Sequence, residues 1–170
     1  ATQELRQVLI KGDFSNFLIE KTDCISSLHR VMSLKESDRR LRDVEVLLRL
    51  ISFMRSARNY KGNLKAFLDD NMLFINKEWV SLAKKINDLY NLIIETLDFL
   101  KECLGSYECV GRKYEENGPE KRFNRAILEV QVYFGSQING KNTTDEQRLL
   151  FAERFRELEK LMKKLDWDAM

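Results

Sequence analysis

The chain has 170 residues, of which 44% are hydrophobic and 33% are charged, and this length predicts a single helical domain over residues 1–170 with a sizeable core. One proline and seven glycines leave long uninterrupted segments, which disfavours a many-stranded sheet and predicts an all-α fold. The formal net charge of +2 is too close to neutral to indicate a nucleic-acid-binding protein by itself.

The N-terminal third predicts three short helices. The first begins near Gln3 and is ended by Gly12. Asp13 is a candidate N-cap for the second helix, whose Phe14 and Phe17 are expected to face the core. A third helix is predicted within residues 24–34, followed by a linker over residues 33–37 that lets the chain reverse.

Residues 38–72 hold the densest pattern in the chain. Apolar residues recur at the helical period, and polar residues follow the other side of the same predicted helix. The apolar positions are Leu41, Val44, Leu47, Leu48, Ile51 and Met54, and the polar ones are Arg42, Glu45, Arg49 and Ser52. The helix is expected to stop near Asn59, and the turn Tyr60-Lys61-Gly62-Asn63 leads into a second helix that contains Phe67.

The longest predicted helix runs from a candidate N-cap at Asn76 to about Leu104. Its apolar stripe is wide, so we expect it to be contacted from more than one side. Together with the shorter helices this predicts an irregular multi-helix bundle around a long central helix. Ile86 is expected to be fully buried within it.

Residues 105–119 contain Gly105, Gly111, Gly118 and Pro119 and are predicted to form a loop. The run Lys121-Arg122-Phe123-Asn124-Arg125 is expected to open the next helix. The β-branched residues that follow leave a strand over residues 128–134 as an alternative.

The last segment begins with Thr144-Asp145-Glu146-Gln147, a capping-box pattern that predicts a helix start. An amphipathic helix follows, with apolar positions at Phe151, Phe155, Leu158, Met162 and Leu165. Packing onto its own bundle is favoured over pairing with another chain, because the run is short for a sustained coiled coil.

Residues 30–65 carry ten Lys or Arg against four Asp or Glu, a local excess of six positive charges. Two interpretations are open: a solvated helix surface and a patch that faces phosphate groups. The candidate nucleic-acid contacts are Arg39, Arg40, Arg55, Arg58 and Lys61.

No enzyme motif is found, so no catalytic residue is predicted, and one histidine leaves few choices for a general base. The three cysteines lack CxxC spacing, so neither a metal site nor a cofactor is expected. The odd cysteine number and the lack of a signal peptide or transmembrane run predict a cytoplasmic protein without membrane contact.

Several runs of residues carry a family resemblance in a consistent order over about the first 135 residues. They are Gln3-Glu4-Leu5-Arg6 with Gly12 and Phe14, Asp38-Arg39-Arg40-Leu41-Arg42-Asp43, Glu45 with Leu48-Arg49, Tyr60-Lys61-Gly62-Asn63 with Phe67-Leu68-Asp69, and Arg122-Phe123-Asn124-Arg125-Ala126. In these residues the chain resembles the helical region that follows the ParB-like fold in the GmrSD restriction endonuclease N-terminal-domain family. It departs from the family pattern at Leu50-Ile51-Ser52-Phe53, which bears on packing more than on chemistry.

The resemblance implies a helical accessory or scaffold domain of a bacterial restriction or phage-defence protein, partnered by a ParB-like domain and assisting its contact with DNA. The family's DGQQR-type motif is not found in this chain, so no catalytic residue is carried over. The matching residues are therefore predicted to be structural, with a ligand-facing role as the alternative: Arg42, Asp43, Glu45, Arg49, Tyr60, Gly62, Phe67, Arg122, Phe123 and Asn124. The competing functional hypothesis is a protein-interaction module that forms homo-oligomers without touching DNA.

Overall fold

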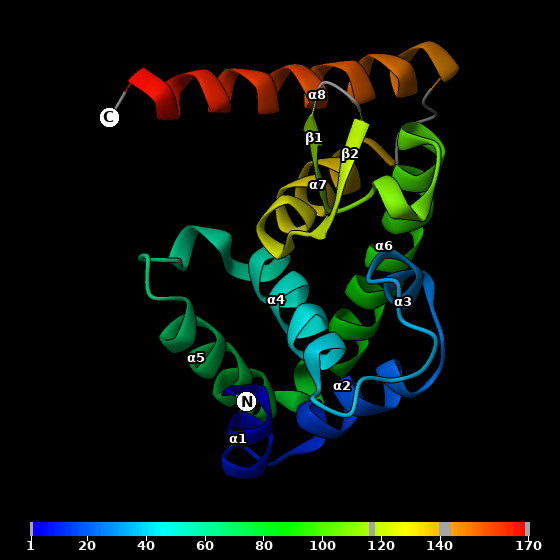
Figure 1. The fold of residues 1–170 in the computed structure, drawn as a ribbon. Helices are drawn as coiled ribbons and strands as arrows, with labels where there is room; N and C mark the ends of the chain where they lie inside the picture. Colours follow the sequence, from blue (N-terminus) through cyan, green and yellow to red (C-terminus); the bar gives the residue numbers. More distant parts are fainter. Residues whose placement is uncertain (1, 116–117, 140–143, 169–170) are drawn as a thin grey trace. The chain divides into compact units, whose positions relative to one another are not determined.

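The computed structural model describes residues 2–115, 118–139 and 144–168. Within them the chain forms eight α-helices, two short 3-10 helices and one two-stranded sheet (Figure 1), which confirms the predicted all-α, multi-helix fold. The chain divides into two compact units, Ala1–Glu95 and Thr96–Met170, and the longest helix, α6 (Trp79–Leu104), spans the boundary between them. The expectation of a single domain over residues 1–170 stays a prediction.

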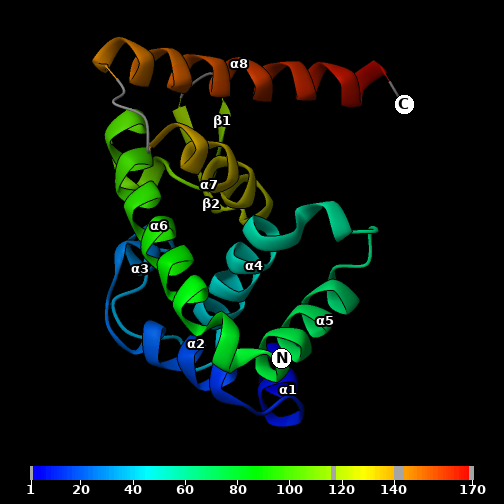
Figure 2. The ribbon, with the colours of Figure 1, turned by 180° about the vertical axis from the view of Figure 1, so that it is seen from behind.

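The first unit is built from α1 to α5 and the first part of α6. Its elements are α1 (Thr2–Leu9), α2 (Asp13–Asp23), α3 (Ser27–Val31), α4 (Arg42–Ser56), the 3-10 helix η1 (Ala57–Asn59) and α5 (Leu64–Lys77). Helices α2, α4 and α5 pack against one another around fully buried side chains such as Phe14, Ile51 and Met72. Figure 2 shows α2 beside the first half of α6, where Phe17 contacts Tyr90 with ring centroids 6.1 Å apart. Ile86 is buried, as predicted.

Helix α1 buries its polar side and exposes its apolar side. Gln3 and Arg6 are buried, and the Arg6 guanidinium donates to Asp69 on α5 at 2.6 Å. The large apolar side chains of Leu5, Val8 and Leu9 are 64%, 65% and 78% exposed. Ion pairing to α5 therefore sets the orientation of α1, in place of burial of its apolar residues.

Asn76 does not cap the long helix, contrary to the sequence-based prediction. It lies inside α5, and its Oδ1 accepts hydrogen bonds from the backbone N–H groups of Phe14 and Ser15 at 2.9 and 3.3 Å. It therefore caps α2 from another helix, and the prediction that Asp13 caps α2 is also wrong, since Gly12 holds the N-cap position without a side-chain bond. A Cβ on Gly12 would lie 2.3 Å from Asn76 Oδ1, so only glycine leaves room for this contact.

The second unit contains the predicted loop region, which instead forms a small hairpin. Its elements are the end of α6, η2 (Tyr107–Cys109), β1 (Arg112–Glu115), β2 (Gly118–Phe123), α7 (Arg125–Asn139) and α8 (Asp145–Asp168). The strands pair antiparallel, with Arg112 opposite Phe123. The expectation of a loop over residues 105–119 is therefore wrong for β1 and the start of β2, and Lys121–Phe123 belong to β2 rather than to a helix.

Residues 128–134 lie inside α7, so the alternative of a strand there is excluded. The capping box at the start of α8 is confirmed: Gln147 N donates to Thr144 Oγ1 at 3.3 Å, and Thr144 N donates to Gln147 Oε1 at 3.0 Å. Phe155 of α8 is buried, while the predicted apolar positions Leu158, Met162 and Leu165 lie outside the described side chains. Among the described helices, none combines the length and the apolar character needed to cross a membrane.

Candidate functional site

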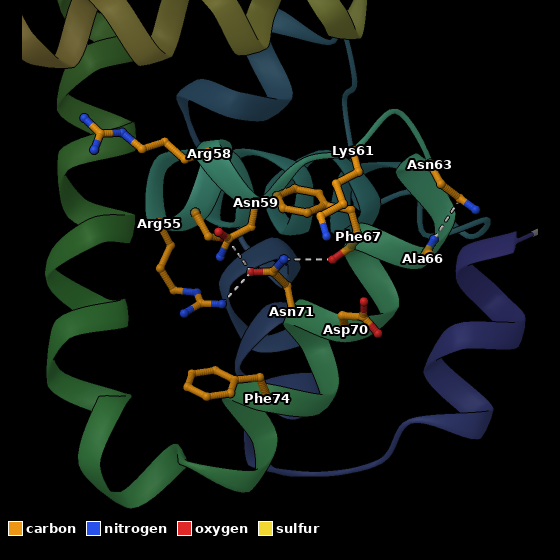
Figure 3. A pocket seen from close by; sticks show the side chains of 11 residues that line it. Arg55, Arg58, Asn59, Lys61, Asn63, Ala66, Phe67, Asp70, Asn71 and Phe74 are labelled. Carbon is orange, nitrogen blue, oxygen red and sulfur yellow. Dashed lines mark hydrogen bonds between the residues drawn. The ribbon is translucent and has the colours of Figure 1, made fainter.

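A cleft opens in the first unit where α4 ends and the chain turns back into α5 (Figure 3). Its volume is about 690 Å³, within the range of about 300–1,000 Å³ that is typical of small-molecule sites. We call it the Arg55 cleft. It is lined by Arg55, Ser56, Arg58, Asn59, Lys61, Asn63, Ala66, Phe67, Asp70, Asn71 and Phe74.

Arg55 is the half-buried anchor of the cleft. Its Nη2 donates to Asn71 Oδ1 at 2.7 Å, and its guanidinium carbon lies 4.8 Å from the centre of the Phe74 ring. Burial lowers the pKa of Arg55 from its ordinary value, although a guanidinium remains charged at neutral pH. Its Nε is buried without a hydrogen-bond partner among the described residues. The guanidinium is therefore held over an aromatic ring by its hydrogen bond to Asn71 and its contact with Phe74.

Asn71 fixes the floor of the cleft. It is buried, its Nδ2 donates to the Phe67 carbonyl at 2.7 Å, and its Oδ1 accepts from both Arg55 and Ser56. Sequence reasoning missed Asn71 and Phe74. The spacing of Phe67, Asn71 and Phe74 places them on one helix face, but nothing in that pattern predicts which partner an asparagine finds.

Three aromatic rings support the turn that forms the rim. The ring centroids of Phe53, Tyr60 and Phe67 lie 5.0–5.4 Å from one another. The Tyr60 hydroxyl donates to the Gly62 carbonyl at 3.2 Å, and Gly62 has a φ of 88°, which favours glycine. Tyr60, Gly62 and Phe67 therefore contribute to the turn that forms the rim, and their assignment as structural residues stays a prediction.

Arg58 and Lys61 lie on the rim of the cleft, and their charged groups are not paired with described residues. Both are exposed, and neither has a hydrogen-bond or ion-pair partner within the described residues. Figure 3 shows them at the opposite end of the cleft from Phe74, with Asn71 between. Asp70 is the acidic residue of the lining. Three of the five predicted nucleic-acid contacts thus line one cleft that carries a positive excess.

Arg39 and Arg40, the other two predicted contacts, lie elsewhere. They are exposed and precede α4, whereas Arg55 is near its end. Helix α4 has 15 residues, which separates its ends by about 22 Å at a rise of about 1.5 Å per residue. The structure therefore does not bring the five basic residues together.

A closed polar cluster occupies the start of α4. His29 Nε2 lies 3.1 Å from Asp43 Oδ2, and both side chains are almost completely buried. The Asp38 backbone N–H also donates to Asp43 at 2.9 Å, while Arg42 pairs with the Asp38 carboxylate. Sequence reasoning gave His29 no role, because its partner lies fourteen positions away with no repeating pattern to link them. Arg42 and Asp43 make contacts within this cluster, and their assignment as structural residues stays a prediction.

Three further polar residues of α4 face inward. Arg49 Nη1 lies 3.6 Å from Glu45 Oε1, and both side chains are mostly buried. Ser52, three residues further along the same side, is completely buried. The polar side of α4 is therefore largely buried from Glu45 to Ser52, whereas Arg42 at its start is exposed.

The last three residues that the resemblance predicts to be structural, Arg122, Phe123 and Asn124, lie in the second unit. Asn124 Oδ1 accepts from the backbone N–H groups of Ala126 and Ile127 at 3.0 and 3.2 Å, which makes Asn124 the N-cap of α7. The Phe123 ring covers the Arg112 guanidinium at 5.0 Å, and Arg122 is exposed on β2. Asn124 and Phe123 thus have structural contacts, whereas the exposed Arg122 side chain has no hydrogen-bond or ion-pair partner among the described residues.

No group of three or more metal-ligating side chains is found in the part of the chain that the structure describes. Cys24, Cys103 and Cys109 are free thiols. Burial raises the pKa of Cys103 to about 11, so its thiol is protonated at neutral pH and is a poor nucleophile. In the first unit, the positive excess of Arg55, Arg58 and Lys61 over Asp70 in the Arg55 cleft favours contact with an anion.

Comparisons with models of protein families, with curated proteins and with solved structures found no match to this chain. The resemblance to the GmrSD restriction endonuclease N-terminal-domain family stays a prediction.

Proposed function

We propose that this chain is a helical accessory module of a bacterial restriction or phage-defence protein and that its Arg55 cleft contacts the phosphate groups of nucleic acid. One observation carries the nucleic-acid part of the proposal: Arg55, Arg58 and Lys61 line the same cleft, and the charges of Arg58 and Lys61 are unpaired among the described residues. The family resemblance supports the cellular role and a ParB-like domain as the partner.

Free cations on a cleft rim suit phosphate contact for an electrostatic reason. Each phosphate that a lysine or arginine neutralises releases condensed counterions, which favours binding at low salt. An arginine or lysine already paired to a carboxylate gains less, because it must first lose that partner. Arg58 and Lys61 therefore have more to contribute than Arg42, which already pairs with Asp38.

The test is a titration of a fluorescein-labelled duplex DNA with the 170-residue chain over a salt series, read by anisotropy. The double variant R58E/K61E is expected to bind at least about tenfold more weakly and to reduce the salt slope by about two, since each duplex phosphate contact contributes about 0.9. Arg55 is left unchanged because its contacts with Asn71 and Phe74 give it a structural role as well.

The matched control is K77E/K85E, which changes the net charge equally at two exposed lysines outside the cleft. Equal weakening by the control would mean that only the overall charge matters. Absence of any DNA binding by the unaltered chain at low salt would remove the nucleic-acid part of the proposal.

The second candidate function is a protein-interaction module. The observation that favours it is the exposed apolar side of α1, formed by Leu5, Val8 and Leu9. Exposed apolar residues grouped on one helix face are typical of protein–protein contacts. If this side mediates self-association, the molar mass of the chain measured by light scattering is expected to increase with concentration. The double variant L5S/V8S is expected to abolish that increase. A single monomer mass at all concentrations would count against self-association.

A further inference from the structure

We infer that the Arg55 cleft takes one unstacked nucleotide, with its base on the Arg55–Phe74 pair and its flanking phosphates toward Arg58 and Lys61. This inference rests on the proposed contact with nucleic acid and names the form of nucleic acid that the cleft recognises.

Phe74 and Arg55 form a candidate stacking surface in the cleft. Phe74 is 47% exposed although it lines the cleft, and the Arg55 guanidinium lies over its ring at 4.8 Å. Proteins that bind unpaired nucleic acid stack bases on aromatic rings and on the planes of arginine guanidiniums. The hydrogen bond from Arg55 to Asn71 fixes this plane before any ligand binds, so little side-chain freedom is lost on binding.

The exposed cations and the Phe74 ring lie at opposite ends of the cleft. Arg58 and Lys61 lie at the end of the cleft away from Phe74 (Figure 3), so a ligand with a flat apolar part and an anionic part can satisfy both ends. A phosphate ion alone would leave the exposed ring unused. A nucleotide has both parts, and the cleft volume of about 690 Å³ is large enough for a small molecule.

Two polar side chains of the cleft lining are available to hydrogen-bond a ligand. Asn59 and Asp70 line the cleft, are exposed and have no side-chain hydrogen bond among the described residues. An amide both donates and accepts, and a carboxylate accepts from an amino or hydroxyl group. Asp70 also repels phosphate, so the anionic part of the ligand is directed toward Arg58 and Lys61 rather than toward α5.

A base inside a duplex is covered on both faces by its neighbours, and reaching a cleft of this kind requires it to leave the stack. The inference therefore predicts a preference for single-stranded nucleic acid over duplex. A free mononucleotide has the same chemistry, and the experiment distinguishes the two sources.

The experiment measures anisotropy of a short fluorescein-labelled single strand and of a matched duplex with the full chain and three variants. F74L removes the ring but keeps an apolar side chain, and R55K keeps the charge but removes the plane. Both are expected to weaken single-strand binding about tenfold, and F74L is expected to leave duplex binding unchanged. The control L73A shortens the neighbouring exposed apolar side chain and is expected to change neither.

Competition separates the possible ligands without any variant. Displacement of the labelled strand by AMP or TMP identifies a free nucleotide as sufficient, and displacement only by unlabelled oligonucleotide identifies the strand as the ligand. Displacement by inorganic phosphate as effective as that by AMP or TMP would overturn the role of the base.

The same measurements test base stacking separately from phosphate contact. If F74L and R55K bind the single strand as well as the unaltered chain, while R58E/K61E still weakens duplex binding, the stacking is refuted and the phosphate contact stands. If the unaltered chain binds neither nucleic acid, both are refuted.

Discussion

The two ends of α4 carry polar clusters of opposite kinds. At its start, Asp43 accepts hydrogen bonds from His29 and from the Asp38 backbone, and the other ring nitrogen of His29 accepts from the Ser26 backbone at 3.2 Å. At its end, Arg55 has one hydrogen bond, and Arg58 and Lys61 have none among the described residues. The first cluster satisfies its polar atoms internally, whereas the second leaves charge available to a ligand.

This difference indicates which polar residues serve the fold. A buried charge costs several kcal/mol to desolvate and is tolerated only when its partners are in place, so the His29–Asp43 pair has to stay closed. Because Nδ1 accepts from Ser26, the proton between His29 and Asp43 belongs to Nε2. The exposed side chains of Arg58 and Lys61 stay hydrated and have no such desolvation cost. They can therefore contact a ligand without a partner in the fold.

The largest effect is expected for Asp43→Ala at the closed end. The change leaves His29 Nε2 and the Asp38 N–H without their acceptor in a buried site, and we expect about 3–5 kcal/mol less stability. Urea unfolding followed by circular dichroism measures it. Asp70→Ala, which removes an exposed carboxylate in the open cleft, is the control and is expected to stay within about 0.5 kcal/mol. Equal effects of the two changes would contradict the comparison.

A smaller effect is expected for Asn71→Ala, at the buried floor of the open cleft. Arg55, Ser56 and the Phe67 carbonyl each lose a hydrogen bond, and we expect a loss of about 1–3 kcal/mol. The same unfolding experiment measures it, with Asn59→Ala as the control, because Asn59 lines the cleft without a side-chain partner. A stability like that of the unaltered chain would show that Arg55 does not need this anchor.

The Arg6–Asp69 pair has a smaller expected effect than either change and gives a pH dependence. Burial by itself raises the pKa of Asp69, but hydrogen bonds from Arg6 and Lys65 outweigh it and hold the pKa below its ordinary value. The pair therefore contributes stability above about pH 4, and that contribution is lost as pH falls through the lowered pKa of the folded state. We expect about 1 kcal/mol or less for a pair with this exposure.

The measurement is the urea midpoint of the unaltered chain and of Asp69→Asn between about pH 2 and pH 7. The variant is expected to be less stable at neutral pH and to approach the unaltered chain at the acid end. Parallel curves at all pH values would contradict the assigned pKa shift.

The sequence predicts those parts of the fold that depend on local signals. Hydrophobic period locates α4, α5 and α6, the turn at Tyr60–Asn63 lies where its glycine indicates, and the Thr144–Gln147 capping box forms as its spacing predicts. Each of these signals involves residues within one or two turns of one another.

The failures involve partners far apart in the chain. Asn76 caps a helix whose first residues lie more than sixty positions earlier, and its sequence neighbourhood alone suggested the start of α6. The hairpin at Arg112–Phe123 escaped prediction because its strands are short and rich in charged residues. For the candidate site, clustered charge indicated Arg55, Arg58 and Lys61, but only the structure separates them from Arg39 and Arg40 and adds Asn71 and Phe74.

The smallest effect on stability is expected for Arg58→Gln combined with Lys61→Gln on the cleft rim. Neither side chain has a partner among the described residues, so their loss should change the free energy of unfolding by no more than about 0.5 kcal/mol. The same variant is expected to weaken nucleic-acid binding, which anisotropy measures on the same preparation. Loss of stability together with binding would mean that the rim cations support the fold, and the open end of α4 would then resemble its closed end. Retained stability with lost binding would establish that the two ends differ in what they serve.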